Sequence, residues 1–118
     1  MLLRVLVIAH LYVISQPSIA VGDEQPPFDL SESKRIEAGR LRFNGSCAGY
    51  CHGGEGVGGR APSFKGRGDE FDADYAYRTI ENGRKGSGAV MLRWGETFSP
   101  EEIWELVAYL KFLSRQKI

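Results

Sequence analysis

The sequence lacks three features that would assign it to common classes of protein. Its 15 basic and 15 acidic side chains cancel to a formal net charge of zero, which argues against binding to nucleic acid. No segment sustains an alternation of apolar and polar residues, so we expect no extensive β-sheet. The mostly apolar run from Leu2 to Ile14 is shorter than the roughly 20 residues that span a bilayer. The 118 residues suffice for one small domain and leave no room for a second core.

The N-terminal segment has the pattern of an export signal. Arg4 supplies a short basic start, an apolar stretch follows, and Ser18-Ile19-Ala20 places small residues where signal peptidase cleaves. We predict a Sec-type signal peptide and a periplasmic mature protein without a stable membrane span; a retained anchor is the alternative. The predicted organisation is a signal peptide over 1–20, a linker over 21–28 and a single domain over 29–118.

Cleavage would leave few residues able to bind a redox group. The mature chain would contain one histidine, one methionine and two cysteines. The two cysteines and the histidine are clustered in the segment Cys47-Ala48-Gly49-Tyr50-Cys51-His52. Two cysteines followed directly by a histidine are typical of covalent haem attachment, in which the thiols form thioethers and the imidazole binds the iron. The usual spacing has two residues between the cysteines, whereas this segment has three.

Other interpretations of the cluster remain open at this stage. A disulfide between Cys47 and Cys51 is permitted by export, but its ring would be tight and would leave His52 unexplained. A structural zinc ion needs four nitrogen or sulfur ligands, and the mature chain offers only these three. Two free buried thiols would be unusual in an oxidising compartment. The cluster therefore favours one covalent haem c.

Met91 is the candidate for the second axial ligand of the iron. It is the only methionine of the mature chain, and the segment around it precedes a strongly capped helix. A methionine that fills a gap in the core is the alternative. Ligation by histidine and methionine would favour electron transfer over chemistry on oxygen.

Three helices are predicted by cap signals and apolar periodicity. The first begins near Asp29 to Ser33 and ends at about Asn44, and the second is capped by Asp72 or Asp74 and stopped by Asn82-Gly83. The third has the clearest signal, with Ser99 as N-cap, proline next and Glu102 completing a capping box.

Nine of the fifteen glycines lie between Gly45 and Gly68, and we expect this region to wrap closely around another group. It contains Gly54-Glu55-Gly56-Val57-Gly58-Gly59, which matches the G-x-G-x-x-G pattern of dinucleotide sites. No apolar strand precedes the match and no periodic helix follows it. We therefore interpret it as a flexible loop at the haem edge.

These residues together resemble the class I cytochrome c family, from about Ser33 to Leu113. Gly39 and Phe43 are similar to the glycine and aromatic residue of the family's first helix, and Tyr109 to the aromatic residue that packs on that glycine. The resemblance implies that the carbonyl of Pro62 accepts a hydrogen bond from His52 and that Met91 is the distal ligand. Leu92 departs from the family's pattern, which has proline after that methionine.

The resemblance implies an all-α, cytochrome c-like domain of three main helices wrapped around a covalent haem c. Its function would be one-electron transfer between periplasmic redox proteins, without enzymatic activity. The longer cysteine spacing is similar to that of periplasmic cytochromes serving quinoprotein alcohol or methanol dehydrogenases. A quinoprotein dehydrogenase is therefore the candidate donor, and a terminal oxidase or another cytochrome the candidate acceptor. The alternatives are a haem subunit of a larger dehydrogenase or reductase complex, and an open-site haem enzyme or gas sensor if Met91 is not a ligand.

Overall fold

The structure is a computed structural model that describes residues 25–86 and 89–118. The predicted signal peptide and the first part of the predicted linker lie outside these residues. The elements in chain order are α1 (Ser33–Ser46), η1 (Ala48–His52), η2 (Gly54–Gly56), η3 (Gly68–Glu70), α2 (Ala73–Asn82), β1 (Arg84–Lys85), β2 (Val90–Met91), η4 (Trp94–Glu96) and α3 (Pro100–Ser114). No helix among the described residues is long and apolar enough to span a membrane.

The caps of α2 and α3 form as predicted. The side chain of Asp72 accepts a hydrogen bond of 2.9 Å from the backbone N–H of Tyr75, and Gly83 ends α2 with a φ of 71°. At α3, the Ser99 hydroxyl and the Glu102 carboxylate bond reciprocally to each other's backbone N–H groups. These bonds satisfy donors that every helix N-terminus leaves free, so both boundaries follow from local sequence.

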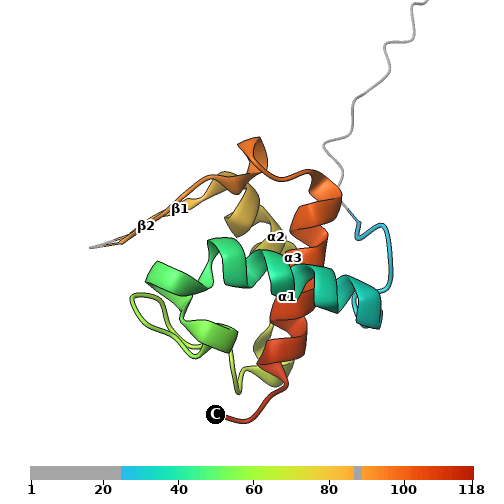
Figure 1. Cartoon of the computed structure of the whole chain (residues 1–118), viewed down its shortest axis with the longest axis horizontal. Coiled ribbons are helices and arrows are strands. Elements are labelled where there is room, and N and C mark those ends of the chain that lie inside the picture. The colour runs from blue at the N-terminus through green and yellow to red at the C-terminus, as the bar shows by residue number, and fades with distance from the viewer. Residues whose placement is uncertain (1–24, 87–88) are drawn as a thin grey trace, which may run out of the picture.

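The crossing of α1 over α3 forms the centre of the domain (Figure 1). A Cβ placed on Gly39 would lie 2.0 Å from the backbone oxygen of Glu105 and 2.9 Å from Cβ of Tyr109. Only glycine permits so close a crossing of two helix backbones. Phe43, one turn further along α1, packs edge-on against Tyr109 with ring centroids 5.3 Å apart. The all-α fold and the resemblance of Gly39, Phe43 and Tyr109 are confirmed by this packing.

Helix α3 supplies most of the core. Its side chains from Ile103 to Leu110 are all buried, and Trp104 stacks on Tyr77 of α2 with ring centroids 4.5 Å apart. The only sheet in the described residues is the antiparallel pair β1–β2, with Arg84 opposite Met91 and Lys85 opposite Val90. Met91, predicted to lie in an irregular loop, is thus part of a two-residue ladder.

Candidate functional site

Helix α1 carries the first cysteine to the edge of the core. Gly39, Phe43 and Cys47 follow each other at intervals of four residues, so they lie on one side of the helix. Gly39 and Phe43 are buried against α3, and Cys47 is partly buried and packs on the same core. The N–H of Cys47 donates to the carbonyl of Phe43 at 2.8 Å, which makes the cysteine continuous with α1. The α1–α3 crossing therefore fixes the position of Cys47.

The turn η1 then presents Cys51 and His52. The glycine-rich loop that follows, from Gly53 to Gly68, holds this turn in place by hydrogen bonds. The carbonyl of His52 accepts a hydrogen bond from the N–H of Gly58 at 2.8 Å. The carbonyl of Cys51 accepts one from the N–H of Ala61 at 2.9 Å. Carbonyls at the end of a helical turn need such external donors. The loop, predicted to be a flexible wrap, is instead bonded back onto the turn that bears the cysteine and histidine.

The imidazole of His52 lies between aromatic rings. It stacks on Phe64 with ring centroids 4.9 Å apart and an interplanar angle of 27°, and it lies 6.1 Å from the ring of Phe43. Burial lowers the pKa of His52, which favours the neutral imidazole that can bind a metal. Phe64 was not anticipated from the sequence as a wall of the site, although its position two residues after Pro62 is a usable signal.

The Nδ1 atom of His52 is buried and has no hydrogen-bond partner in the structure. Pro62 lies close to this region, because a Cβ on Gly58 would lie 3.4 Å from the carbonyl carbon of Pro62. The hydrogen bond that the family resemblance implies between Pro62 and His52 is nevertheless not made. A buried polar atom without a partner is costly, so this nitrogen needs a hydrogen-bond acceptor. Pro62 stays a predicted partner of the imidazole.

Both cysteines are free in the structure. Burial, and secondarily the proximity of Cys51, raises the pKa of the Cys47 thiol to about 11. In the described parts of the chain, no three histidine, cysteine or acidic side chains are grouped so that they could hold a metal ion. The geometry therefore disfavours the zinc interpretation.

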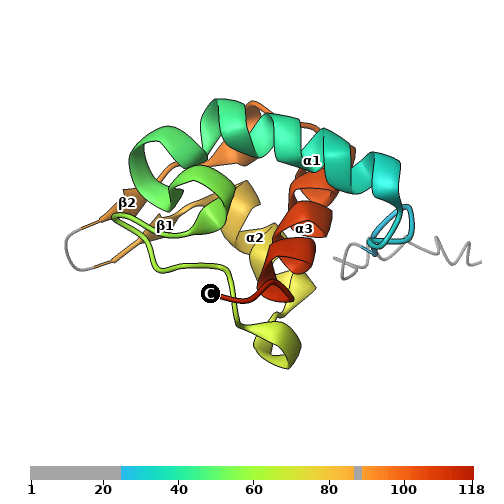
Figure 2. The same cartoon turned by 60° about the horizontal axis from the view of Figure 1, so that its bottom comes forward.

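Met91 is presented by the β1–β2 ladder and the end of α2. A Cβ on Gly83 would lie 2.5 Å from the backbone oxygen of Met91, and one on Gly95 would lie 2.9 Å from the backbone oxygen of Glu81. These two glycines let the segment between them run against the C-terminal turn of α2. The Met91 side chain is partly buried and packs on the core. Figures 1 and 2 both place the ladder at the same end of the molecule as η1.

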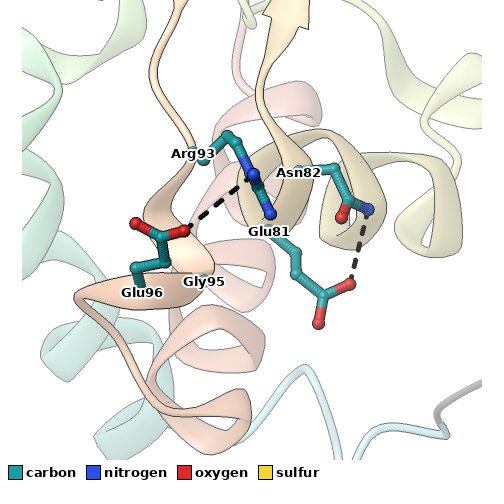
Figure 3. A pocket seen from close by; sticks show the side chains of 5 residues that line it. All are labelled: Glu81, Asn82, Arg93, Gly95 and Glu96. Carbon is teal, nitrogen blue, oxygen red and sulfur yellow. Dashed lines mark hydrogen bonds and ion pairs between the residues drawn. The ribbon is translucent and has the colours of Figure 1, made fainter.

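A hollow of about 270 Å³ marks the outer side of this contact between α2 and the Met91 segment. Figure 3 shows Arg93 extending along it toward Glu96, with their charged atoms 3.9 Å apart, while Asn82 bonds weakly to Glu81 at 3.5 Å. The hollow is polar and lined by exposed pairs of this kind, which contribute little energy. The hollow arises because the segment around Met91 folds back against the end of α2. Its lining residues do not form a binding site of their own.

A charged cluster joins α1 to α3 and was not anticipated from the sequence. Glu105, whose side chain is 11% exposed, accepts hydrogen bonds from Arg35 at 2.9 Å and from Arg42 at 2.7 Å. Arg35 also bonds to Glu101, and Arg42 to Glu102 at 3.1 Å. The partners are 60 to 70 residues apart in sequence, so no local pattern reveals the pairing. The cluster secures the helix crossing that positions Cys47.

The residues at this end of the molecule fit a covalently attached haem. Two free cysteines and an imidazole with an unpartnered buried nitrogen lie on one turn, and a partly buried methionine lies at the same end of the fold. Thioether attachment needs thiols that are not bonded to each other, and iron needs a nitrogen or sulfur donor on each side. These residues are of the types that one covalently attached haem requires.

Solved structures of c-type cytochromes have the same fold. Cytochrome cL from the marine methylotrophic bacterium Methylophaga aminisulfidivorans MPT superposes with a TM-score of 0.59 at 23% identity, over 72% of this chain and 57% of that one. The c-type cytochrome XoxG from Methylobacterium extorquens AM1 gives 0.57 at 21% identity, over 71% and 58%. Cytochrome cL from Hyphomicrobium denitrificans gives 0.59 at 20% identity, over 79% and 54%. The chain thus spans less than 60% of each of these proteins.

The fold and the cluster at Cys47, Cys51 and His52 define this chain as a cytochrome c domain. It belongs to the family described as cytochrome c oxidase, cbb3-type, subunit III, which matches residues 34–110. This match includes the cysteines, the histidine, Pro62 and Met91. Membership of a cytochrome c family implies a haem c cofactor and a role in electron transfer. No curated protein matches the sequence at a significant level.

Proposed function

We propose that this chain is a periplasmic one-electron carrier with one haem c attached to Cys47 and Cys51 and ligated by His52 and Met91. The observation that carries the proposal is the arrangement of the first three residues on one turn at the end of α1, with the His52 imidazole partly buried and stacked on Phe64. The haem, when bound, supplies an iron that is oxidised and reduced by one electron. The chain's residues bind it, orient it and exclude water from one side.

His52 and its neighbours would form the proximal side. Phe64 and Phe43 restrict the rotation of the imidazole, and partial burial lowers its pKa, which favours the neutral form whose free electron pair can bind iron. An acceptor for the Nδ1 proton would fix the tautomer, and Pro62 is our candidate. Cys47, held by the α1–α3 crossing, would anchor one edge of the haem.

Met91 would close the distal side and leave no open position on the iron. The test is optical spectroscopy of the purified protein and of Met91→Ala, with Leu92→Ala as the matched control because the neighbouring Leu92 side chain is 65% exposed. We expect the weak far-red band that reports sulfur ligation to ferric haem in the wild type and in Leu92→Ala. Met91→Ala should lose this band and bind carbon monoxide. Carbon monoxide binding by the wild type would instead favour the open-site enzyme or gas sensor.

The surface around Met91 is suited to docking of an acidic redox partner. Val90 and Leu92, on either side of Met91, are 64% and 65% exposed. Arg84 and Lys85 on β1 are exposed directly across the ladder. Apolar contacts framed by positive charge are typical of brief, electrostatically steered encounters. Other basic loop residues have local partners instead, since Lys65 pairs with Glu55 and Arg67 bonds to the carbonyl of Ser63.

The candidate donor is a quinoprotein alcohol or methanol dehydrogenase, and the acceptor a terminal oxidase or another cytochrome. The longer cysteine spacing supports this choice of donor, as does the shared fold with two cytochromes cL, one from a methylotrophic bacterium. Lys85→Glu should slow reduction by the dehydrogenase and weaken its dependence on ionic strength. Lys34→Glu, at the 70% exposed second position of α1, should leave the rate unchanged. Equal rates for all three proteins would refute docking at the ladder.

A haem subunit within a larger complex is the second candidate, because the matched family is described as an oxidase subunit. Size-exclusion chromatography of the native periplasmic extract, followed by haem absorbance, separates the two. Elution as a small monomer supports the free carrier, and co-elution with a large haem or quinone enzyme supports the subunit.

A further inference from the structure

The segment that bears the two cysteines is wound differently from the helix before it. The N–H of Cys47 makes the last α-helical bond, to the carbonyl of Phe43. The next two hydrogen bonds join residues five apart instead of four. The N–H of His52 donates to the carbonyl of Cys47 at 3.2 Å, and the N–H of Gly53 donates to the carbonyl of Ala48 at 2.8 Å. Bonds between residues five apart define a π-turn, and such turns commonly mark an extra residue at a functional site.

The extra residue changes which positions lie on the same side of the turn. A π-turn takes in about one residue more than the 3.6 residues of an α-turn. The fourth residue after Cys47 therefore lies roughly where the third would lie in an α-turn, and the fifth lies where the fourth would lie. These positions are Cys51 and His52. Two intervening residues on an α-turn and three on a π-turn thus present the cysteine and the histidine in nearly the same directions.

We infer that the π-turn absorbs the third intervening residue, so that the attachment segment is an α-turn expanded by one residue, and that Gly49 is the surplus residue. The inference rests on the proposed haem attachment and says how this chain achieves it. Gly49 is singled out by its surroundings: a Cβ placed on it would meet nothing within 4 Å. Its neighbours are engaged, since Ala48 packs on the core and the Tyr50 ring lies 4.2 Å from the Arg60 guanidinium carbon.

Both ends of the π-turn are held, which explains why the wider winding persists. The start continues from α1, whose Phe43 is buried against α3. At the far end, Gly53 adopts a φ of 74°, and a Cβ there would lie 2.3 Å from the carbonyl oxygen of Gly58. The carbonyls of Cys51 and His52 accept hydrogen bonds from backbone N–H groups of the glycine-rich loop. A turn fixed in this way can lose its surplus residue without moving either end.

The test is removal of Gly49, which leaves two residues between the cysteines. Gly49→Ala is the matched control that keeps the length, and insertion of a second glycine after Gly49 is the opposite change. All are expressed as full-length exported protein and assayed for covalent haem by mass spectrometry and for methionine ligation by the far-red band. We expect the deletion variant and Gly49→Ala to carry covalent haem within about twofold of wild type, with the band intact, because only the turn changes.

The insertion variant should lose the far-red band. A turn larger than a π-turn would rotate the His52 side chain away from the direction in which it can bind the iron. A deletion variant that lacks haem, or that holds haem without the band, would overturn the inference, as would an insertion variant indistinguishable from wild type. A wild type without haem would remove the proposed function and this inference together. A haem-bearing wild type with a defective deletion variant removes this inference alone.

Discussion

Replacement of Gly39 by alanine tests whether the α1–α3 crossing holds the domain together. The new methyl group would lie 2.0 Å from the backbone oxygen of Glu105, where ordinary contacts begin at 3.4 Å. The oxygen belongs to a helix backbone and cannot rotate away, so the helices must separate by about 1.4 Å. A gap of 0.5–1 Å already forfeits roughly a quarter to a half of a contact's attraction, and Phe43 and Tyr109 lie in this interface.

Alanine favours helix over glycine by about 1 kcal/mol, whereas overpacking costs about 1–3 kcal/mol and occasionally more. Because the clash is with backbone, we place the cost of overpacking above this usual range, at about 4 kcal/mol, and expect Gly39→Ala to lower the free energy of unfolding by a net amount of about 3 kcal/mol. At roughly 4–8 °C per kcal/mol for a domain of this size, the Tm should fall by at least about 12 °C. The assay is thermal and urea unfolding of the haem-loaded protein, followed by far-ultraviolet circular dichroism.

Gly45→Ala is the control in the same helix, because a Cβ on Gly45 would meet nothing within 4 Å. It should raise the free energy of unfolding by up to about 1 kcal/mol. The two variants carry the same chemical change, so their opposite signs isolate the steric term. A Gly39→Ala protein as stable as wild type, or one that shifts in the same direction as Gly45→Ala, would refute the reasoning.

Three further results are expected. The Glu102 pKa is lowered, mainly by the hydrogen bond it accepts from the backbone of the N-cap serine, so its stabilisation is present above about pH 4.5 and is lost as pH falls through the folded-state pKa. Glu102→Gln keeps the capping-box acceptor and removes only the charge, so it should cost about 0.5 kcal/mol in urea unfolding at pH 7, and a cost that persists in acid would contradict this. Glu105→Ala removes the acceptor that Arg35 and Arg42 share, while Glu101 and Glu102 stay as their partners, and should cost about 2 kcal/mol by the same assay; a variant as stable as wild type would show that Glu105 does not secure the helix crossing. Gly83→Ala brings a methyl group against the Met91 carbonyl at a φ of 71°, and should weaken the far-red band while leaving covalent haem unchanged; an unaltered band would show that Met91 does not depend on this contact.

Local signals in the sequence were sufficient for much of the fold. The Ser99 cap, the Asp72 cap and the Gly83 stop lie within four residues of the groups they bond, so the boundaries of α2 and α3 could be predicted. The start of α1 could not be fixed, because its N-cap position is Glu32, whose side chain makes no cap bond. Where a helix begins without a local cap, tertiary contacts decide.

The remaining features depend on residues far apart in the chain. Glu105 joins two arginines more than 60 residues away, and no periodicity predicts that pairing. Phe64 stacks on His52 because the glycine-rich loop folds back on η1. This packing was not predicted, because the loop was expected to be flexible. The π-turn was also missed, since sequence patterns are read with the α-helical period. The extra residue between the cysteines was its visible sign.

The segments that carry His52 and Met91 differ in local stability, and this difference determines which of them unfolds first. His52 lies on a turn continuous with a buried helix, whereas Met91 lies on a ladder of only two residue pairs. Two-stranded ribbons of this length are marginally stable by themselves, and such elements open at a small fraction of the global unfolding cost. Amide hydrogen exchange should therefore be fast at Val90 and Met91 and slow along α1 and α3. In the proposed haem-bound protein, Met91 could then leave the iron through local opening of the ladder while the rest of the molecule stays folded.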